Sequence, residues 1–284
     1  MKAEYKPFID ELIELCIKED IGDGDHTSLC CIPDTAQGKM QLLCKQEGVI
    51  AGIEIAELIL KRLDPQMKFE QVLTDGTVVK PGDIAFYVSG RVQSLLQAER
   101  VLLNTMQRMS GVATETARYV KRLEGLKTRV LDTRKTTPGM RMLDKMAVKI
   151  GGGDNHRIGL FDMILLKDNH IDFAGGVFNA VKAAREYLAA KGKNIPIECE
   201  VRTLEDIDEV FRAGGADRIM FDNFSPALTI EGIAKVAGRC ETESSGGINY
   251  DTMRDYAECG VDFISIGALT HQIKSLDMSL KAIE

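Results

Sequence analysis

From residue 128 onward the chain repeats one unit, which consists of a short apolar strand, a polar end and a helix. Strands are predicted at 129–132, 163–166, 195–199, 218–221, 241–244 and 263–266. Helices are predicted between them, at 176–190, 204–213 and 227–237, with Thr203 as an N-cap and Ser225 before Pro226 in the first turn. Apolar, β-branched strands that alternate with helices form a parallel sheet covered by helices. The spacing favours an open (incomplete) parallel α/β barrel, short of the usual eight strands, over the alternative of a doubly wound open sheet.

The chain before residue 128 has a different rhythm. Helices are predicted at 8–19, 53–63 and from about 92 to 123, the last loosened at Ser110-Gly111, and strands at 39–44, 69–73 and 84–87. We therefore expect an N-terminal α+β sandwich domain over residues 1–127 and a C-terminal barrel domain over residues 128–284. The C-terminal segment is a candidate to return to the first domain.

Composition excludes several classes of protein. The 284 residues carry a net charge of −7, which disfavours a nucleic-acid partner. The longest stretch without a charged residue, 263–273, is too short to cross a bilayer, so we expect no membrane partner. The N-terminus lacks the apolar core of a signal peptide. Seven cysteines without a CxxC pattern indicate reduced thiols, and we expect a cytoplasmic protein.

A basic island interrupts the acidic chain. Residues 134–167 hold seven basic and three acidic side chains. Such an island favours one site for a small anionic ligand, because a polyanion needs a long basic surface. For Arg141, Lys145 and Lys149, which recur every fourth residue, a solvated helix face is the simpler interpretation.

Polar side chains and glycines follow every predicted barrel strand. They are Thr133, Arg134 and Lys135 after the first, Lys167 to His170 after the second, Glu200 and Arg202, then Asp222 and Asn223, then Ser244 to Gly247, and finally Gly267 and Ala268. Because the carboxyl ends of barrel strands gather at one rim, these groups are candidates for one active site. The glycines after the last two strands favour a phosphate site at helix N-termini.

Glu200 and Asp222 lie on neighbouring strand ends among these cations. They balance the cations, bind sugar hydroxyls or ligate Mg²⁺. Cations beside them favour ionised carboxylates, so an electrostatic role is preferred over general acid or base catalysis. The four histidines share no metal-ligand spacing, which argues against a zinc or iron site.

The motifs that carry these residues resemble those of the quinolinate phosphoribosyltransferase family. They are Glu99–Asn104, Asp132–Gly139, Gly151–Arg157, Leu166–His170, Glu243–Gly247 and Gly267–His271, in family order. The resemblance implies an N-terminal α/β sandwich and a C-terminal open α/β barrel. It also implies that quinolinate and phosphoribosyl pyrophosphate react, with Mg²⁺, to nicotinate mononucleotide, pyrophosphate and CO₂.

The resemblance further assigns roles to single residues. Arg134, Lys135, His156, Arg157 and Lys167 would hold the quinolinate carboxylates and the phosphates, and Glu200 and Asp222 the ribose hydroxyls and Mg²⁺. Ser245, Gly246, Gly247, Gly267 and Ala268 would cradle the 5-phosphate. Thr133, Ile266 and His271 complete the substrate-binding set. Lys135, Lys167, Glu200 and Asp222 are the expected catalytic residues. Arg100 would reach the neighbouring subunit's site, which makes a homodimer the minimal active unit.

Two other functions remain open at this point. One is a related protein of the same fold with another acceptor, such as nicotinate, or with a role in molybdenum metabolism. The other is a non-catalytic binder of phosphorylated metabolites.

Overall fold

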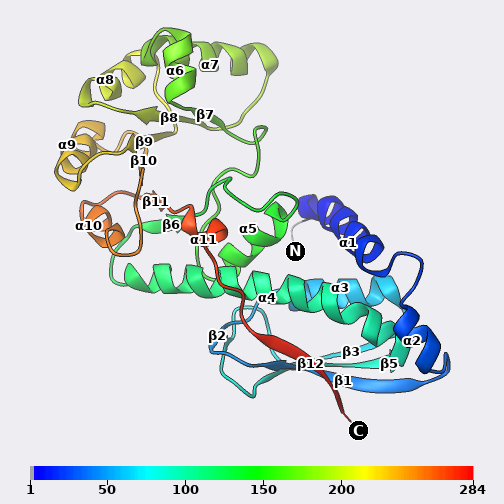
Figure 1. Cartoon of the computed structure of the whole chain (residues 1–284). Coiled ribbons are helices and arrows are strands. Elements are labelled where there is room, and N and C mark those ends of the chain that lie inside the picture. Colours follow the sequence, from blue (N-terminus) through cyan, green and yellow to red (C-terminus); the bar gives the residue numbers. More distant parts are fainter. Residues whose placement is uncertain (1–2, 284) are drawn as a thin grey trace. The chain divides into compact units, whose positions relative to one another are not determined.

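The computed structural model describes residues 3–283, and these form two compact units (Figure 1). The first unit comprises the described parts of Met1–Arg118, Thr136–Gly152 and Leu269–Glu284. The second comprises Tyr119–Lys135 and Gly153–Ala268. Within residues 3–283, no helix is long and apolar enough to cross a membrane.

The first unit is built around an antiparallel sheet with the strand order β12-β1-β5-β3. Its strands are β1 (Gln37–Cys44), β3 (Lys68–Gln71), β5 (Ile84–Arg91) and β12 (Met278–Ile283). A second, two-stranded sheet pairs β2 (Gly48–Val49) with β4 (Val78–Val79). The last strand, β12, pairs with the first, β1, over Lys39–Cys44.

The first unit also contains helices, which confirms the predicted α+β sandwich. They are η1 (Ala3–Tyr5), α1 (Lys6–Ile21), α2 (His26–Cys31), α3 (Ile53–Leu63), α4 (Val92–Arg122) and α5 (Arg141–Ile150). Figure 1 shows α3 and α4 along one face of the sheet. The side chain of Gln107 in α4 donates to the carbonyl of Met278 in β12 at 3.0 Å, and the hydroxyl of Ser110 accepts from the backbone N–H of Ala51 at 2.9 Å.

Helix α4 is continuous, so the predicted loosening at Ser110-Gly111 is wrong. Gly111 instead allows the backbone of Lys274 and Ser275 to pass close to the helix. A Cβ atom on Gly111 would lie 2.5 Å from the carbonyl oxygen of Lys274 and 3.1 Å from the Cα of Ser275. The segment that leads into β12 therefore passes directly over the helix backbone at this position.

Helix α5 corrects a second expectation. Lys149 is exposed, but Lys145 is fully buried, so these residues do not form one solvated face. Asp144, also fully buried, accepts two hydrogen bonds of 2.9 Å from the guanidinium of Arg108 in α4. Burial away from water raises the pKa of Asp144, and the Arg108 contact opposes that rise.

The second unit contains a six-stranded parallel sheet. The strands are β6 (Arg129–Leu131), β7 (Ile164–Leu166), β8 (Ile197–Val201), β9 (Arg218–Asp222), β10 (Glu241–Ser245) and β11 (Phe263–Ser265). The helices are α6 (Asp168–Ala174), α7 (Val177–Lys191), α8 (Leu204–Arg212), α9 (Pro226–Val236) and α10 (Met253–Glu258), with α11 (Ala268–His271) following β11. All six strands overlap the predicted ones, and α7 to α9 match the predicted helices within one residue at each end.

The strand order is β6-β11-β10-β9-β8-β7. Each strand from β7 to β11 pairs with the next, and β11 closes onto β6, while β6 and β7 are not paired. In a doubly wound sheet, the order of successive strands across the sheet reverses at an inner strand. The order therefore confirms the open barrel and excludes the doubly wound alternative. One isolated bridge, Leu131 with Asp154, extends the sheet beyond β6.

Local sequence signals explain how the barrel helices begin. The Thr203 hydroxyl accepts from the backbone N–H of Asp206 in a capping box, and the Ser225 hydroxyl accepts from that of Leu228, with Pro226 in the first turn. Side chains alternate along each strand, so Phe221 of β9 faces outward, where its ring packs against Gly232 of α9. The positions on either side of it, Met220 and Asp222, face the barrel interior.

We predict that Gly111→Ala destabilises the protein by about 1–3 kcal/mol, because the new methyl group meets backbone that has no rotamer to escape into. Asn104→Ala, at an exposed position of the same helix, serves as the control. Thermal unfolding of both variants tests this, and an unchanged melting temperature for Gly111→Ala would show that the crossing segment is not held closely.

Candidate active site

A cavity of about 330 Å³ lies in the barrel unit at the carboxyl ends of the strands. Its lining includes seven of the residues that the sequence singles out: Thr133, Arg134, Lys135, His156, Arg157, Lys167 and Ser245. Leu165, Met220, Glu243 and Ser265 complete the lining. The cavity is thus lined mainly by cationic and hydroxyl groups with a few apolar side chains, and its charge suits small anionic ligands.

The cation of Lys167 is held by a carboxylate. Lys167 follows β7, and its Nζ lies 2.8 Å from Oε1 of Glu200 on the neighbouring strand β8. The other oxygen, Oε2, accepts from the backbone N–H of Asp168 at 3.1 Å. The side chain of Glu200 is 7% exposed and that of Lys167 48%, so a buried carboxylate holds the ammonium group of a half-exposed lysine.

Asp222 ends β9, the strand next to Glu200. Its Oδ2 accepts from the side-chain amide of Asn223 at 3.0 Å. Partial burial raises the pKa of Asp222, and the negative charge of Glu200 raises it further. The charge of Glu200 thus disfavours ionisation of Asp222, and a bound cation would relieve that repulsion.

The segment between β6 and β7 is anchored by Asp132, which directly follows β6 and is fully buried. One oxygen of Asp132 accepts from the backbone N–H of His156 at 2.8 Å, and the other from the side-chain amide of Asn155 at 2.7 Å. These bonds explain how a stretch that follows three glycines delivers His156 and Arg157 to the cavity. Burial lowers the pKa of the Arg157 guanidinium, and the positive charge of Arg134 lowers it further.

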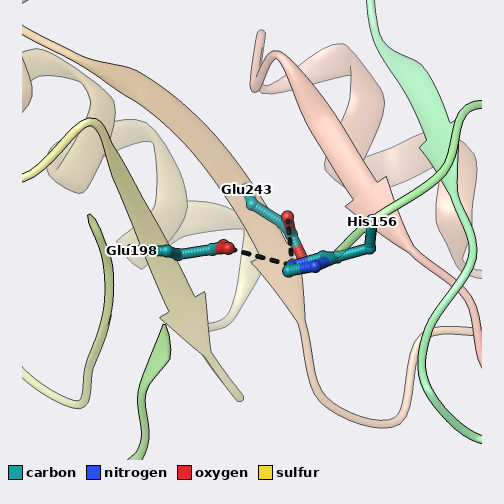
Figure 2. Close-up of side chains that lie close together, drawn as sticks. All are labelled: His156, Glu198 and Glu243. Carbon is teal, nitrogen blue, oxygen red and sulfur yellow. Dashed lines mark ion pairs between the residues drawn. The ribbon is translucent and has the colours of Figure 1, made fainter. Parts of the chain in front are cut away.

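Two glutamates lie inside the barrel beside His156. Figure 2 shows Glu198 of β8 and Glu243 of β10 directed toward the imidazole. The Nε2 atom of His156 lies 2.9 Å from Oε2 of Glu198 and 3.6 Å from Oε2 of Glu243. Both glutamates are fully buried, and this loss of water raises the pKa of each carboxyl group.

The glycines after β10 form a loop rather than a helix start. The next helix, α10, begins only at Met253, so the expected helix N-terminus at Gly246-Gly247 is wrong. Gly246 has a φ of 95°, and a Cβ there would lie within 3 Å of the backbone nitrogen of Asn223. Asn223, itself at a φ of 55°, donates its backbone N–H to the carbonyl of Ser245. The tight turn requires glycine, and an anion bound here would meet loop backbone instead of a helix dipole.

The strand β11 ends beside the same loop. The hydroxyl of Ser265 donates to that of Ser245 at 3.0 Å, and the backbone N–H of Ile266 donates to the carbonyl of Leu131. Gly267 and Ala268 follow, and Ala268 begins α11, which is a single turn. This places Ser245, Ile266, Gly267 and Ala268 on adjoining strand ends of the barrel.

Two of the predicted site residues, Arg100 and His271, belong to the first unit. Arg100 lies on α4 and lines a separate cavity of about 390 Å³ in that unit, together with Asn104, Arg108 and Glu19. Arg100 is exposed, as is His271 at the end of α11.

No sequence motif predicts a role for Glu198, and Asp132 and Glu243 stand only as members of the family motifs. The signal for Glu198 was its spacing. It stands two residues before Glu200 on a strand, so the two side chains share the interior face of the barrel. The burial of Glu198 could not be predicted from the sequence, because barrel interiors are normally apolar.

Comparisons with known proteins agree with this geometry. The model "Quinolinate phosphoribosyl transferase, N-terminal domain" matches residues 25–110, and the corresponding C-terminal domain matches residues 112–281. The "Nicotinate-nucleotide pyrophosphorylase [carboxylating], chloroplastic" of Arabidopsis thaliana is 43% identical, over 95% of this chain and 81% of that protein. The "Probable nicotinate-nucleotide pyrophosphorylase [carboxylating]" of Bacillus subtilis is 41% identical, over 96% of this chain and 92% of that protein.

Solved structures agree as well. NadC from Streptococcus pyogenes superposes with a TM-score of 0.91 at 37% identity, covering 97% of each chain. The nicotinate-nucleotide pyrophosphorylase of Francisella tularensis superposes with a TM-score of 0.90 at 37% identity, covering 98% of this chain and 96% of that one. Human nicotinic acid phosphoribosyltransferase, at 15% identity and a TM-score of 0.64, shares the fold. The chain belongs to the quinolinate phosphoribosyltransferase family.

We predict that Glu243→Gln changes how stability depends on pH. A carboxyl whose folded pKa is raised contributes stability below its ordinary pKa of 4.5 and loses it as pH rises through its folded pKa of about 8. Wild type should therefore lose stability across this window relative to Glu243→Gln, by up to about 1.4 kcal/mol per pH unit.

Urea unfolding at several pH values measures this difference. Glu241→Gln is the control, since that carboxylate lies on the same strand but is half exposed. Parallel stability curves for wild type and Glu243→Gln would contradict the buried, proton-binding state of Glu243.

Proposed function

We propose that this member of the quinolinate phosphoribosyltransferase family transfers the phosphoribosyl group of phosphoribosyl pyrophosphate to quinolinate, with loss of CO₂. The products are nicotinate mononucleotide and pyrophosphate, a step of NAD biosynthesis. The observation that carries the proposal is one cavity in which Arg134, Lys135, Arg157 and Lys167 converge from three segments of the barrel. Two strongly anionic substrates repel each other, and this concentration of positive charge offsets the repulsion.

Quinolinate carries two adjacent carboxylates on a flat aromatic ring. Arg134 and Arg157 are suited to carboxylates because a guanidinium donates two parallel hydrogen bonds. The apolar side chains of Leu165 and Met220 in the same lining offer a surface for the ring. Thr133 and His156 complete this part of the substrate-binding set.

The transfer step joins the pyridine nitrogen to C1 of the ribose as the bond from C1 to pyrophosphate breaks. The ribose gains positive charge in the transition state, and pyrophosphate gains negative charge. Glu200 and Asp222, as groups that bind the ribose hydroxyls, stabilise the positive charge on the ribose. Lys135 and Lys167 stabilise the negative charge on pyrophosphate. The Lys167–Glu200 pair keeps both charges at the required place before substrate binds.

Decarboxylation follows from the charge of the new pyridinium ring. When the bond from C2 to its carboxylate breaks, the electron pair stays at C2 beside the positively charged nitrogen, and C2 then takes up a proton. The cations of the cavity hold the second carboxylate, which remains in the product. This step requires no general base.

Glu200 and Asp222 also fit a magnesium site. Their oxygens are the ligands that Mg²⁺ prefers, and the mutual repulsion that raises the pKa of Asp222 favours a cation between them. When bound, Mg²⁺ would neutralise the charge of the departing pyrophosphate. The 5-phosphate is assigned to the backbone of Gly246, Gly247, Gly267 and Ala268, with Ser245, Ile266 and His271 nearby in the motifs.

The active unit is proposed to be a homodimer in which Arg100 of one subunit completes the site of the other. Arg100 is exposed on α4, where it is available to a partner. We also propose a cytoplasmic location. All seven cysteines are free thiols, as expected in a reducing compartment, whereas curated relatives from plants are named chloroplastic or mitochondrial.

The decisive experiment measures CO₂ released from carboxyl-labelled quinolinate. We expect release that requires both phosphoribosyl pyrophosphate and Mg²⁺, and no comparable product from nicotinate. Arg134→Ala should lower kcat/KM by about 100-fold or more, since it removes one preorganised donor. Arg202, which the sequence placed among the candidates at the strand ends, pairs with Asp172 and does not line the cavity, so Arg202→Ala should leave kcat/KM unchanged.

Two results would overturn the proposal. Preferential use of nicotinate would assign the protein to another acceptor. Binding of phosphoribosyl pyrophosphate without release of pyrophosphate or CO₂ would make it a binding protein. A fully active, folded Arg134→Ala variant would remove the role of that residue alone.

Mixed subunits test the shared site. Arg100→Ala and Lys167→Ala should each be nearly inactive by themselves. When mixed, a heterodimer should regain one intact site, and with random exchange about a quarter of wild-type activity, because half of the dimers are mixed and half of their sites are whole. Lack of any recovery despite subunit exchange, confirmed by differently tagged chains, would contradict the crossing of Arg100.

A further inference from the structure

Two fully buried carboxylates, Glu198 and the cavity-lining Glu243, have no role in the proposed reaction. An ionised group inside a barrel is unfavourable unless it is paired. Both side chains point at the same atom, Nε2 of His156, from strands that are separated by β9 (Figure 2). Two strands therefore converge on one imidazole.

The other ring nitrogen of His156 is also engaged. Nδ1 accepts the backbone N–H of Arg157 at 2.7 Å. A nitrogen that accepts a hydrogen bond carries no proton, so the ring proton belongs on Nε2, which faces the carboxylates. The two glutamates thus stabilise the tautomer that allows Nδ1 to hold the Arg157 backbone.

The backbone of the same segment is held independently. Asp132 accepts the backbone N–H of His156 at 2.8 Å. With the ring held at Nε2 and the backbone held at its N–H, His156 has little freedom to turn. The next residue, Arg157, is 8% exposed and lines the cavity.

The chain itself supplies a positive charge beside the two glutamates. Arg218 of β9 lies 3.0 Å from Oε2 of Glu243, and its guanidinium stacks on the ring of Phe263 at 4.1 Å. Although the ligand atoms of His156, Glu198 and Glu243 lie within 4.8 Å of one another, as in a metal site, the Arg218 guanidinium already supplies a cation there. A positioning role explains the group better than a metal.

We infer that Glu198 and Glu243 are positioning residues that fix the imidazole of His156, and through it the backbone of Arg157, at the place where a substrate carboxylate binds. The inference rests on the proposed function for the identity of that substrate. It predicts that loss of either glutamate weakens quinolinate binding through Arg157, while the parts of the site that hold phosphoribosyl pyrophosphate stay intact.

Steady-state kinetics of Glu198→Ala and Glu243→Ala test this. We expect KM for quinolinate to rise about tenfold, with kcat and KM for phosphoribosyl pyrophosphate changed by less than about threefold. Glu198→Gln keeps an acceptor of the same shape and should restore most of the quinolinate KM. Glu241→Gln is the matched control, because it removes a carboxylate that also pairs with Arg218 but does not face His156.

Nitrogen NMR of the histidine rings gives a readout that does not depend on activity. The His156 signals, identified by their loss in His156→Gln, should show a protonated Nε2 and an unprotonated Nδ1 in wild type and in Glu198→Gln. In the alanine variants the ring should become a mixture of tautomers. If the alanine variants do not fold, the ring tautomer seen in the spectra of wild type and Glu198→Gln tests the inference.

The inference is overturned by a wild-type ring protonated on Nδ1 alone, or by folded alanine variants that keep the wild-type KM for quinolinate. Failure of the proposed function is a separate result. In that case wild type itself would not release CO₂ from quinolinate, and the ring tautomer would still report whether the two glutamates hold His156.

Discussion

Charge compensation inside the barrel is the constraint on which this molecule depends. Parallel barrels are usually filled with branched apolar side chains, but here the interior holds Glu198, Glu243 and Arg218, with Glu200 above them. Glu243 lies 3.0 Å from the guanidinium of Arg218 and Glu200 lies 2.8 Å from the ammonium group of Lys167, and such pairing offsets the cost of burying a carboxylate. The same arrangement that makes the interior stable also holds the cations of the cavity in position before any ligand arrives.

The fold was largely readable from the sequence because its signals are local. Apolar runs bounded by polar strand ends gave all six barrel strands, and the caps at Thr203 and Ser225 gave the helix starts. Long-range facts were less accessible. The reason for Gly111 lies in a segment about 160 residues away, and a pattern of every fourth residue cannot show that Lys145 is buried.

The residues of the candidate site also differ in whether local sequence signals could predict them. The residues at strand ends could be predicted, since topology alone brings Arg134, Lys167 and Ser245 to one rim. The supporting residues could not, because Asp132, Glu198 and Glu243 act through contacts between distant segments. The glycines after β10 show the limit of local reasoning, as their loop, rather than a helix terminus, presents the backbone.

The pairing of β12 with β1 has a consequence for biosynthesis. During translation β1 emerges early, but the strand that covers its outer edge follows the entire barrel in the chain. Until then β1 presents unpaired N–H and C=O groups, which is a known risk for association between nascent chains. The sandwich can therefore be completed only after the barrel has been synthesised, so that the part of the protein made first is among the last to finish folding.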